Sequence, residues 1–111
     1  MKKIAIKVTK RKMQLLENAL WFYRYGARLS EECDGKANDL CEFLYSIHRA
    51  APWWKEAKVK FTSSEAWFLE SALKFKLMCT GDAKLYEELF DLYKQVKEAL
   101  RVMVKLNLDN K

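Results

Sequence analysis

The chain repeats itself within its 111 residues. The stretch IKVTKRKMQLLENALWF is followed 53 positions later by VKFTSSEAWFLESALKF, with seven identical residues. A second correspondence, at an offset of 46, relates GKANDLCEFL to GDAKLYEELF. Neither copy could bury its apolar faces alone, so the repeat predicts two similar units, approximately 3–51 and 57–106, packed about an approximate two-fold axis in a single domain spanning 1–111.

Each copy begins with a pattern typical of a short strand. Residues Lys3 to Thr9 alternate between apolar and mostly polar side chains, and Ala57 to Thr62 repeat the alternation. An exposed strand edge favours aggregation, so we expect the two strands to pair with each other. Thr9 and Thr62 can cap the helices that follow, and Glu65 completes a capping box with Thr62.

Apolar spacing of three and four residues predicts two helices in each copy. We expect helices at about Lys10–Leu29, Lys36–Arg49, directly after Thr62, and Asp82–Leu106, with Gly35 and Gly81 in turns. The predicted fold class is therefore mainly α: two units of a strand and a helical hairpin, giving four helices and a small two-stranded sheet. The residues expected to be buried in the second helix are Ala37, Leu40, Cys41, Leu44, Ile47 and His48. The stripe expected on the long last helix is Tyr86, Leu89, Tyr93, Val96, Leu100 and Met103.

That last helix is longer than its counterpart in the first copy. At 1.5 Å per residue it would run to roughly 37 Å, more than the shorter helix could cover. Its C-terminal half would then project, which predicts a possible homodimer through this helix.

Three cysteines, an odd number without close paired spacing, favour a reducing compartment, and we expect a cytoplasmic location. The start MKKIAIKVTK lacks the apolar run of a secretory signal, and no segment approaches the roughly 20 apolar residues of a membrane span. We therefore expect no membrane association.

The charge of +6 arises at the N-terminus. Six basic residues precede position 13, which leaves 15 basic and 15 acidic residues after it. Such an arm suits phosphate or an acidic protein surface, and also serves solubility.

Comparison of the copies directs attention to the first helix. Trp21 and Tyr25 correspond to Lys74 and Met78, and at 100° per residue they project away from Leu16 and Leu20. Lys10, Arg24 and Arg28 lie on the same side. A face of Trp, Tyr and Arg is typical of protein interfaces, suits base stacking equally, and could instead be buried between neighbouring helices.

Two further features could serve binding. Trp53 and Trp54 lie in the connection between the copies, and adjacent side chains on an extended segment cannot both enter the core. Lys3, Lys7, Lys58 and Lys60 would share the outer face of the paired strands, where they could contact nucleic acid or simply protect the small sheet from association.

The sequence offers little for catalysis or cofactors. His48 is the only histidine, and Cys41 on the same helix lies two turns away, about 10 Å distant, too far for a dyad. Three cysteines and one histidine lack the spacing of a structural zinc site, and the three glycines form no phosphate-binding loop. Glu31, Glu32 and Asp34 are interpreted as solvated charges in a loop. We expect no catalytic residues, no metal and no cofactor.

These observations favour a small non-enzymatic protein-binding module, an inhibitor or adaptor of the general type carried by phages and mobile elements. Its predicted partner-binding residues are Trp21, Tyr25, Arg24, Arg28, Lys10, Trp53 and Trp54. The alternative is a nucleic-acid-binding protein that uses Lys3, Lys7, Lys58 and Lys60.

Overall fold

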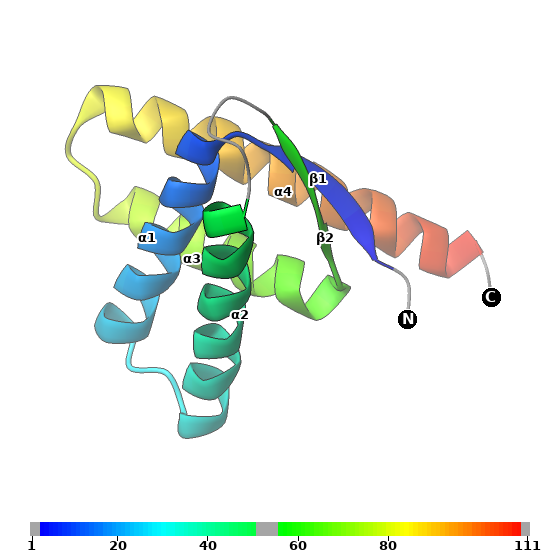
Figure 1. Ribbon diagram of the computed structural model, residues 1–111, viewed down its shortest axis with the longest axis horizontal. Coiled ribbons are helices and arrows are strands. Elements are labelled where there is room, and N and C mark those ends of the chain that lie inside the picture. The colour runs from blue at the N-terminus through cyan, green and yellow to red at the C-terminus, as the bar shows by residue number, and fades with distance from the viewer. Residues whose placement is uncertain (1–2, 51–55, 110–111) are drawn as a thin grey trace.

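The computed structural model describes residues 3–50 and 56–109 and is mainly helical, with four helices and a small two-stranded antiparallel sheet. The elements follow one another as β1 (Ile4–Val8), α1 (Lys10–Gly26), α2 (Glu31–Ala50), β2 (Ala57–Phe61), α3 (Ser63–Met78) and α4 (Ala83–Asp109). Figure 1 shows α1 and α2 running side by side at one end, with the two strands at the other.

The predicted pairing of the two strands is confirmed. β1 and β2 are antiparallel, and Ile6 lies opposite Val59 at the centre of the register. The alternation also holds, because Ile6, Val8, Val59 and Phe61 are buried while the lysines between them are exposed. The Gln95 side chain of α4 donates a hydrogen bond to the Lys7 carbonyl at 2.7 Å, which fixes the long helix against β1.

The helix starts follow from their caps. The Thr9 hydroxyl accepts a hydrogen bond from the Lys12 backbone N–H, and Thr62 and Glu65 form the complete capping box. α4 is capped in the same manner, because the Asp82 carboxylate accepts from the Leu85 N–H at 2.9 Å. These side chains satisfy backbone donors that would otherwise lack partners.

The predicted start of α2 is wrong. The helix begins five residues before Lys36, and Gly35 lies inside it rather than in a turn. The cause is Ser30, whose hydroxyl accepts from the Cys33 N–H at 3.2 Å and caps the helix early. The carboxylates that were predicted to lie in a loop instead occupy the first turn of α2; they are those of Glu31, Glu32 and Asp34. Their negative charge interacts favourably with the positive end of the helix dipole.

α1 ends at Gly26, three residues before the predicted end at Leu29. Arg28 adopts a left-handed backbone conformation with φ of 50°. This conformation ends the helix and is unfavourable for residues other than glycine. α4 extends to Asp109, three residues beyond the predicted Leu106.

The core is one cluster built from all six elements. α1 packs between α2 and α3, α3 also packs on α4, and α4 lies along β1. Ala37, Leu40, Cys41 and Leu44 are buried as predicted, whereas Ile47 and His48 are only half-buried. On α4, Leu89, Val96 and Met103 are buried, but Tyr86 is exposed and Leu92 fills the core instead. Most of the stripe is thus covered by the chain itself, and a homodimer through α4 stays a prediction.

None of the helices within 3–50 and 56–109 combines the length and the apolar character needed to cross a membrane.

Gly26 permits a close approach between α1 and α3. A Cβ at this position would lie 2.8 Å from Cε1 of Phe75, whose ring also packs against Phe22 and Tyr23. We expect Gly26→Ala to lower the free energy of unfolding by about 1–2 kcal/mol, because overpacking outweighs the gain of about 1 kcal/mol in helix propensity. Urea denaturation measures the change, with Gly81→Ala as the control because its Cβ would meet nothing within 4 Å. A Gly26→Ala protein more stable than wild type would contradict this packing.

Candidate functional site

A solvent-exposed aromatic pair lies near the C-terminal end of α1. The rings of Trp21 and Tyr25 stack with centroids 5.3 Å apart and planes inclined by 21°. Trp21 is 49% exposed and Tyr25 is 72% exposed, so this face of α1 is not buried between neighbouring helices. Exposed aromatic area of this kind marks interaction surfaces on small proteins.

Arg24 holds the pair in place from beside it. Its Cζ lies 5.5 Å from the Trp21 ring centroid and 5.9 Å from that of Tyr25. The guanidinium donates two hydrogen bonds to the Asp34 carboxylate, at 2.9 and 3.2 Å, and a third to the Asn38 side chain at 3.0 Å. We call Trp21, Arg24 and Tyr25 together the aromatic ridge.

The forked contact between Arg24 and Asp34 joins α1 to the first turn of α2. Hydrogen bonding to Arg24 lowers the pKa of the Asp34 carboxyl, and the same contact raises the pKa of Arg24. Because the Arg24 side chain is only 14% exposed, its charge is used within the chain. These hydrogen bonds fix the guanidinium beside the two aromatic rings.

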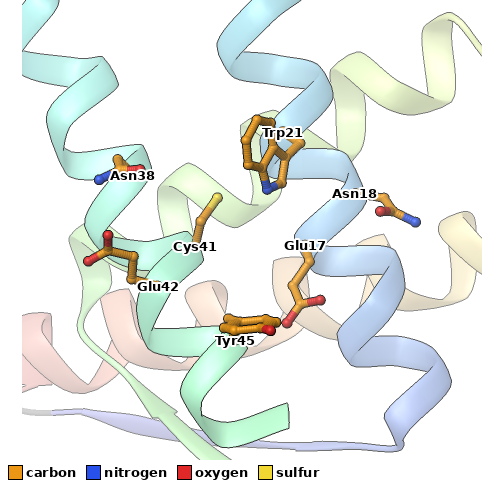
Figure 2. Close-up of a pocket in the computed structure, with 7 residues that line it drawn as sticks. All are labelled: Glu17, Asn18, Trp21, Asn38, Cys41, Glu42 and Tyr45. Atoms are coloured by element: carbon orange, nitrogen blue, oxygen red, sulfur yellow. The ribbon is translucent and has the colours of Figure 1, made fainter. Parts of the chain in front are cut away.

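Two grooves flank the ridge, and both include Asn18 and Trp21 in their walls. The α1–α2 groove has a volume of about 440 Å³, and Figure 2 shows Trp21 and Tyr45 towards opposite ends of it with Cys41 between them. It is lined by Glu17, Asn18, Trp21, Asn38, Cys41, Glu42 and Tyr45. The second, the α1–α4 groove, has a volume of about 420 Å³. It is lined by Leu15, Asn18, Trp21, Phe22, Tyr25, Lys76, Leu85 and Leu89.

The structure brings together only some of the predicted partner-binding residues. Trp21, Arg24 and Tyr25 form the ridge, and the exposed Arg28 follows one residue after the cap of α1. Lys10 begins the helix, roughly 16 Å along its axis from Trp21 at 1.5 Å per residue. Trp53 and Trp54 lie outside the described residues.

The lysines of the alternative site share the outer face of the sheet. Lys7 lies directly opposite Lys58, and Lys60 lies opposite Ala5. All three are exposed, as is Lys3 immediately before β1. Like charges placed opposite each other repel, so this pair of strands carries a local electrostatic cost that an anion would relieve.

The polar side chains of the α1–α2 groove were not identified from sequence as a site. Glu17, on α1, lies 3.4 Å through Oε2 from Nδ1 of His48 on α2. Asn38, Cys41, Glu42 and Tyr45 follow one face of α2 at intervals of three and four residues. That spacing was visible in the sequence, but which face of α1 it meets depends on how the two helices pack.

Within the described stretches, no group of three or more His, Cys, Asp or Glu side chains is arranged to hold a metal ion.

Cys41 and Cys79 differ sharply in environment. Burial raises the pKa of the Cys41 thiol, and the nearby positive charge of Arg24 offsets this only in part. Cys79 follows the end of α3 and is exposed. At pH 8 we expect iodoacetamide to modify Cys41 at least about tenfold more slowly than Cys79, because only the thiolate reacts. Peptide mass spectrometry over time measures both rates, and labelling in urea should equalise them. Equal rates in the folded protein would show that Cys41 is not shielded.

Comparison of the chain with protein-family models, with curated proteins and with solved structures finds no match in any of the three. The ridge, the two grooves and the lysine face are therefore the features from which a function can be inferred.

Proposed function

We propose that this protein is a small non-enzymatic protein-binding module, an inhibitor or adaptor, that contacts its partner through the aromatic ridge. The observation that carries the proposal is the stacked Trp21–Tyr25 pair, exposed at the surface and braced by Arg24. Trp, Tyr and Arg dominate the binding energy of protein interfaces, particularly where an anchor is held rigid before binding.

The grooves beside the ridge support the same function. The aromatic pair alone would provide apolar contact area. Because a groove lies on each side of it, the side chains of a partner can also pack beside the ridge and exclude water. The α1–α4 groove suits apolar side chains, since Leu15, Phe22 and Leu85 contribute to its wall. The α1–α2 groove is more polar, so its side chains can form hydrogen bonds that orient a bound partner.

Site-specific photo-crosslinking tests this proposal. A benzophenone amino acid replaces Tyr25 in one variant and Trp67 in the other, because Trp67 on α3 is similarly exposed, at 56%. We expect a defined protein adduct from position 25, identified by mass spectrometry and re-formed with the purified partner, and little from position 67. The adduct should survive nuclease treatment. Absence of any adduct specific to position 25 would contradict the proposal.

A second candidate function is nucleic-acid binding through Lys3, Lys7, Lys58 and Lys60. The specific observation in its favour is the exposed, repulsive pairing of Lys7 with Lys58. Labelled single- and double-stranded DNA and RNA are titrated across salt concentrations against wild type and a variant with all four lysines changed to alanine. Tight binding that falls steeply with salt and is lost in the variant would establish this function, since phosphate contacts release counterions. No binding at low salt would remove it.

We also infer that the chain arose by duplication and that its halves are related by an approximate two-fold axis through the sheet. Ile6 and Val59 are equivalent at the 53-residue offset and pair with each other, as a two-fold axis between antiparallel strands requires. α4 packs on β1, and Phe43 of α2 correspondingly contacts Phe61 of β2. An experimental structure in which the halves superpose only after a rotation far from 180° would contradict this inference.

A further inference from the structure

We propose that the α1–α2 groove receives the arginine side chain of a protein partner. This proposal rests on the proposed function, because the arginine belongs to a protein that is bound at the adjoining ridge. Trp21 belongs to both the ridge and the groove wall, so a partner seated on the ridge reaches the groove directly.

The charge of the groove is opposite to that of the chain. The chain carries +6, yet among the described residues the charged side chains that line the groove are both carboxylates, those of Glu17 and Glu42. Within the described residues, Glu42 forms no ion pair, and Oε1 of Glu17 accepts no hydrogen bond although it is buried from solvent. The exposed Glu42 carboxylate can bind a ligand with several N–H donors directly, whereas the buried Oε1 of Glu17 attracts such a ligand through its negative charge alone.

The two arginines beside the groove, Arg24 and Arg49, are held within the chain, and each lies against a side chain of the groove wall. Arg24 is bound to Asp34 and Asn38. His48 contacts the other oxygen of Glu17 at 3.4 Å, and Arg49 lies 5.6 Å from the Tyr45 ring centroid. The last contact shows that Tyr45 is in a position to hold a guanidinium against one of its two faces.

The aromatic and amide side chains select the type of cation. Trp21 and Tyr45 lie towards the two ends of the groove, and Asn38 contributes an amide from α2 near the Trp21 end (Figure 2). A guanidinium is planar, stacks on aromatic rings and donates in a fork that matches a carboxylate. An ammonium group has neither the plane nor the fork, so arginine fits this set of side chains better than lysine. A volume of about 440 Å³ accommodates one such side chain together with part of its backbone.

The test uses Nα-acetyl-arginine amide as the probe, titrated into the ¹⁵N-labelled full chain and followed by NMR. The neutral citrulline analogue, the lysine analogue and an equal concentration of sodium chloride are the comparisons. We expect saturable shifts at the Trp21 indole N–H, the Asn38 side chain and the Cys41 amide, with a dissociation constant on the order of 1 mM. Citrulline should produce none of these shifts, and lysine weaker ones.

Charge-neutralising variants locate the contact. Glu17→Gln and Glu42→Gln should each weaken binding of the probe by roughly threefold to tenfold, as expected for a partly exposed charge pair. Asp39→Asn is the matched control, because Asp39 is exposed on the same helix but lines a different groove. Glu42 is itself exposed, so its variant should fold even where Glu17→Gln disturbs the contact with His48.

Equal responses to citrulline or salt, or unchanged affinity in both glutamate variants, would overturn this inference. Those outcomes leave a crosslink from position 25 unaffected, so failure of the arginine site and failure of the proposed function are distinguishable.

Discussion

Phe61→Ala is expected to lower the free energy of unfolding by about 3–5 kcal/mol, the usual cost of removing a fully buried aromatic ring. Phe61 ends β2 and is completely buried, with its ring centroid 6.3 Å from that of Phe43 on α2. The ring therefore links the sheet to α2 as well as filling the core. Since small domains are stable by only about 5–15 kcal/mol, this substitution removes a large part of the total.

Chemical denaturation followed by circular dichroism measures this effect. Phe90→Ala is the matched control, because it removes the same side chain from a position on α4 that is 39% exposed. We expect the control to cost less than about 1.5 kcal/mol, in proportion to the smaller area removed from water. Similar losses for the two variants would mean that Phe61 does not hold the sheet to the helices.

Trp21→Ala is expected to weaken binding of the crosslinked partner by at least about 30-fold, the effect of losing a central aromatic anchor. The same substitution should lower the free energy of unfolding by less than about 1.5 kcal/mol, because half of the side chain is already exposed. The separation between a large loss of affinity and a small loss of stability distinguishes a binding residue from a core residue.

Trp67→Ala provides the comparison for affinity. Trp67 is exposed to a similar extent but lies on α3 and is not part of the aromatic ridge. We expect its affinity change to stay below about threefold, typical of residues outside a hot spot. Calorimetric titration with the purified partner measures both variants, and equal losses for Trp21→Ala and Trp67→Ala would contradict a site on α1.

The local features of the fold were predictable from sequence. Strand alternation at Ile6 and Val8, and again at Val59 and Phe61, depends only on which side chains can face a core. The caps at Thr9 and Thr62 depend on residues within one turn, and both were predicted correctly. The pairing of the strands followed from the need to cover their exposed edges.

The errors arose where two local signals competed. Gly35 indicated a turn, but Ser30 and the acidic residues after it start α2 earlier, and a glycine inside a long helix costs only about 1 kcal/mol. Tyr86 matched the period of the buried stripe on α4, yet Leu85 and Leu89 face the core there, while Tyr86 is exposed and stacks on Phe90. Neither outcome follows from periodicity alone.

The candidate site was predictable only in part. The orientation of Trp21 and Tyr25 away from Leu16 and Leu20 followed from helical geometry. Their exposure did not, because it depends on where α2 and α4 pack around α1. The contact of Arg24 with Asp34 could not be predicted for the same reason, since Asp34 was predicted to lie in a loop and instead lies within hydrogen-bonding distance of Arg24.

Oxidative footprinting of the complex tests the central claim, that the partner covers the aromatic ridge, most directly. Hydroxyl radicals modify exposed aromatic side chains, and mass spectrometry compares the modification rates of Trp21, Tyr25 and Trp67 in the free and bound protein. We predict strong protection of Trp21 and Tyr25 on binding and an unchanged rate at Trp67. Protection of Trp67 with continued modification of Trp21 and Tyr25 would place the partner elsewhere and contradict the claim.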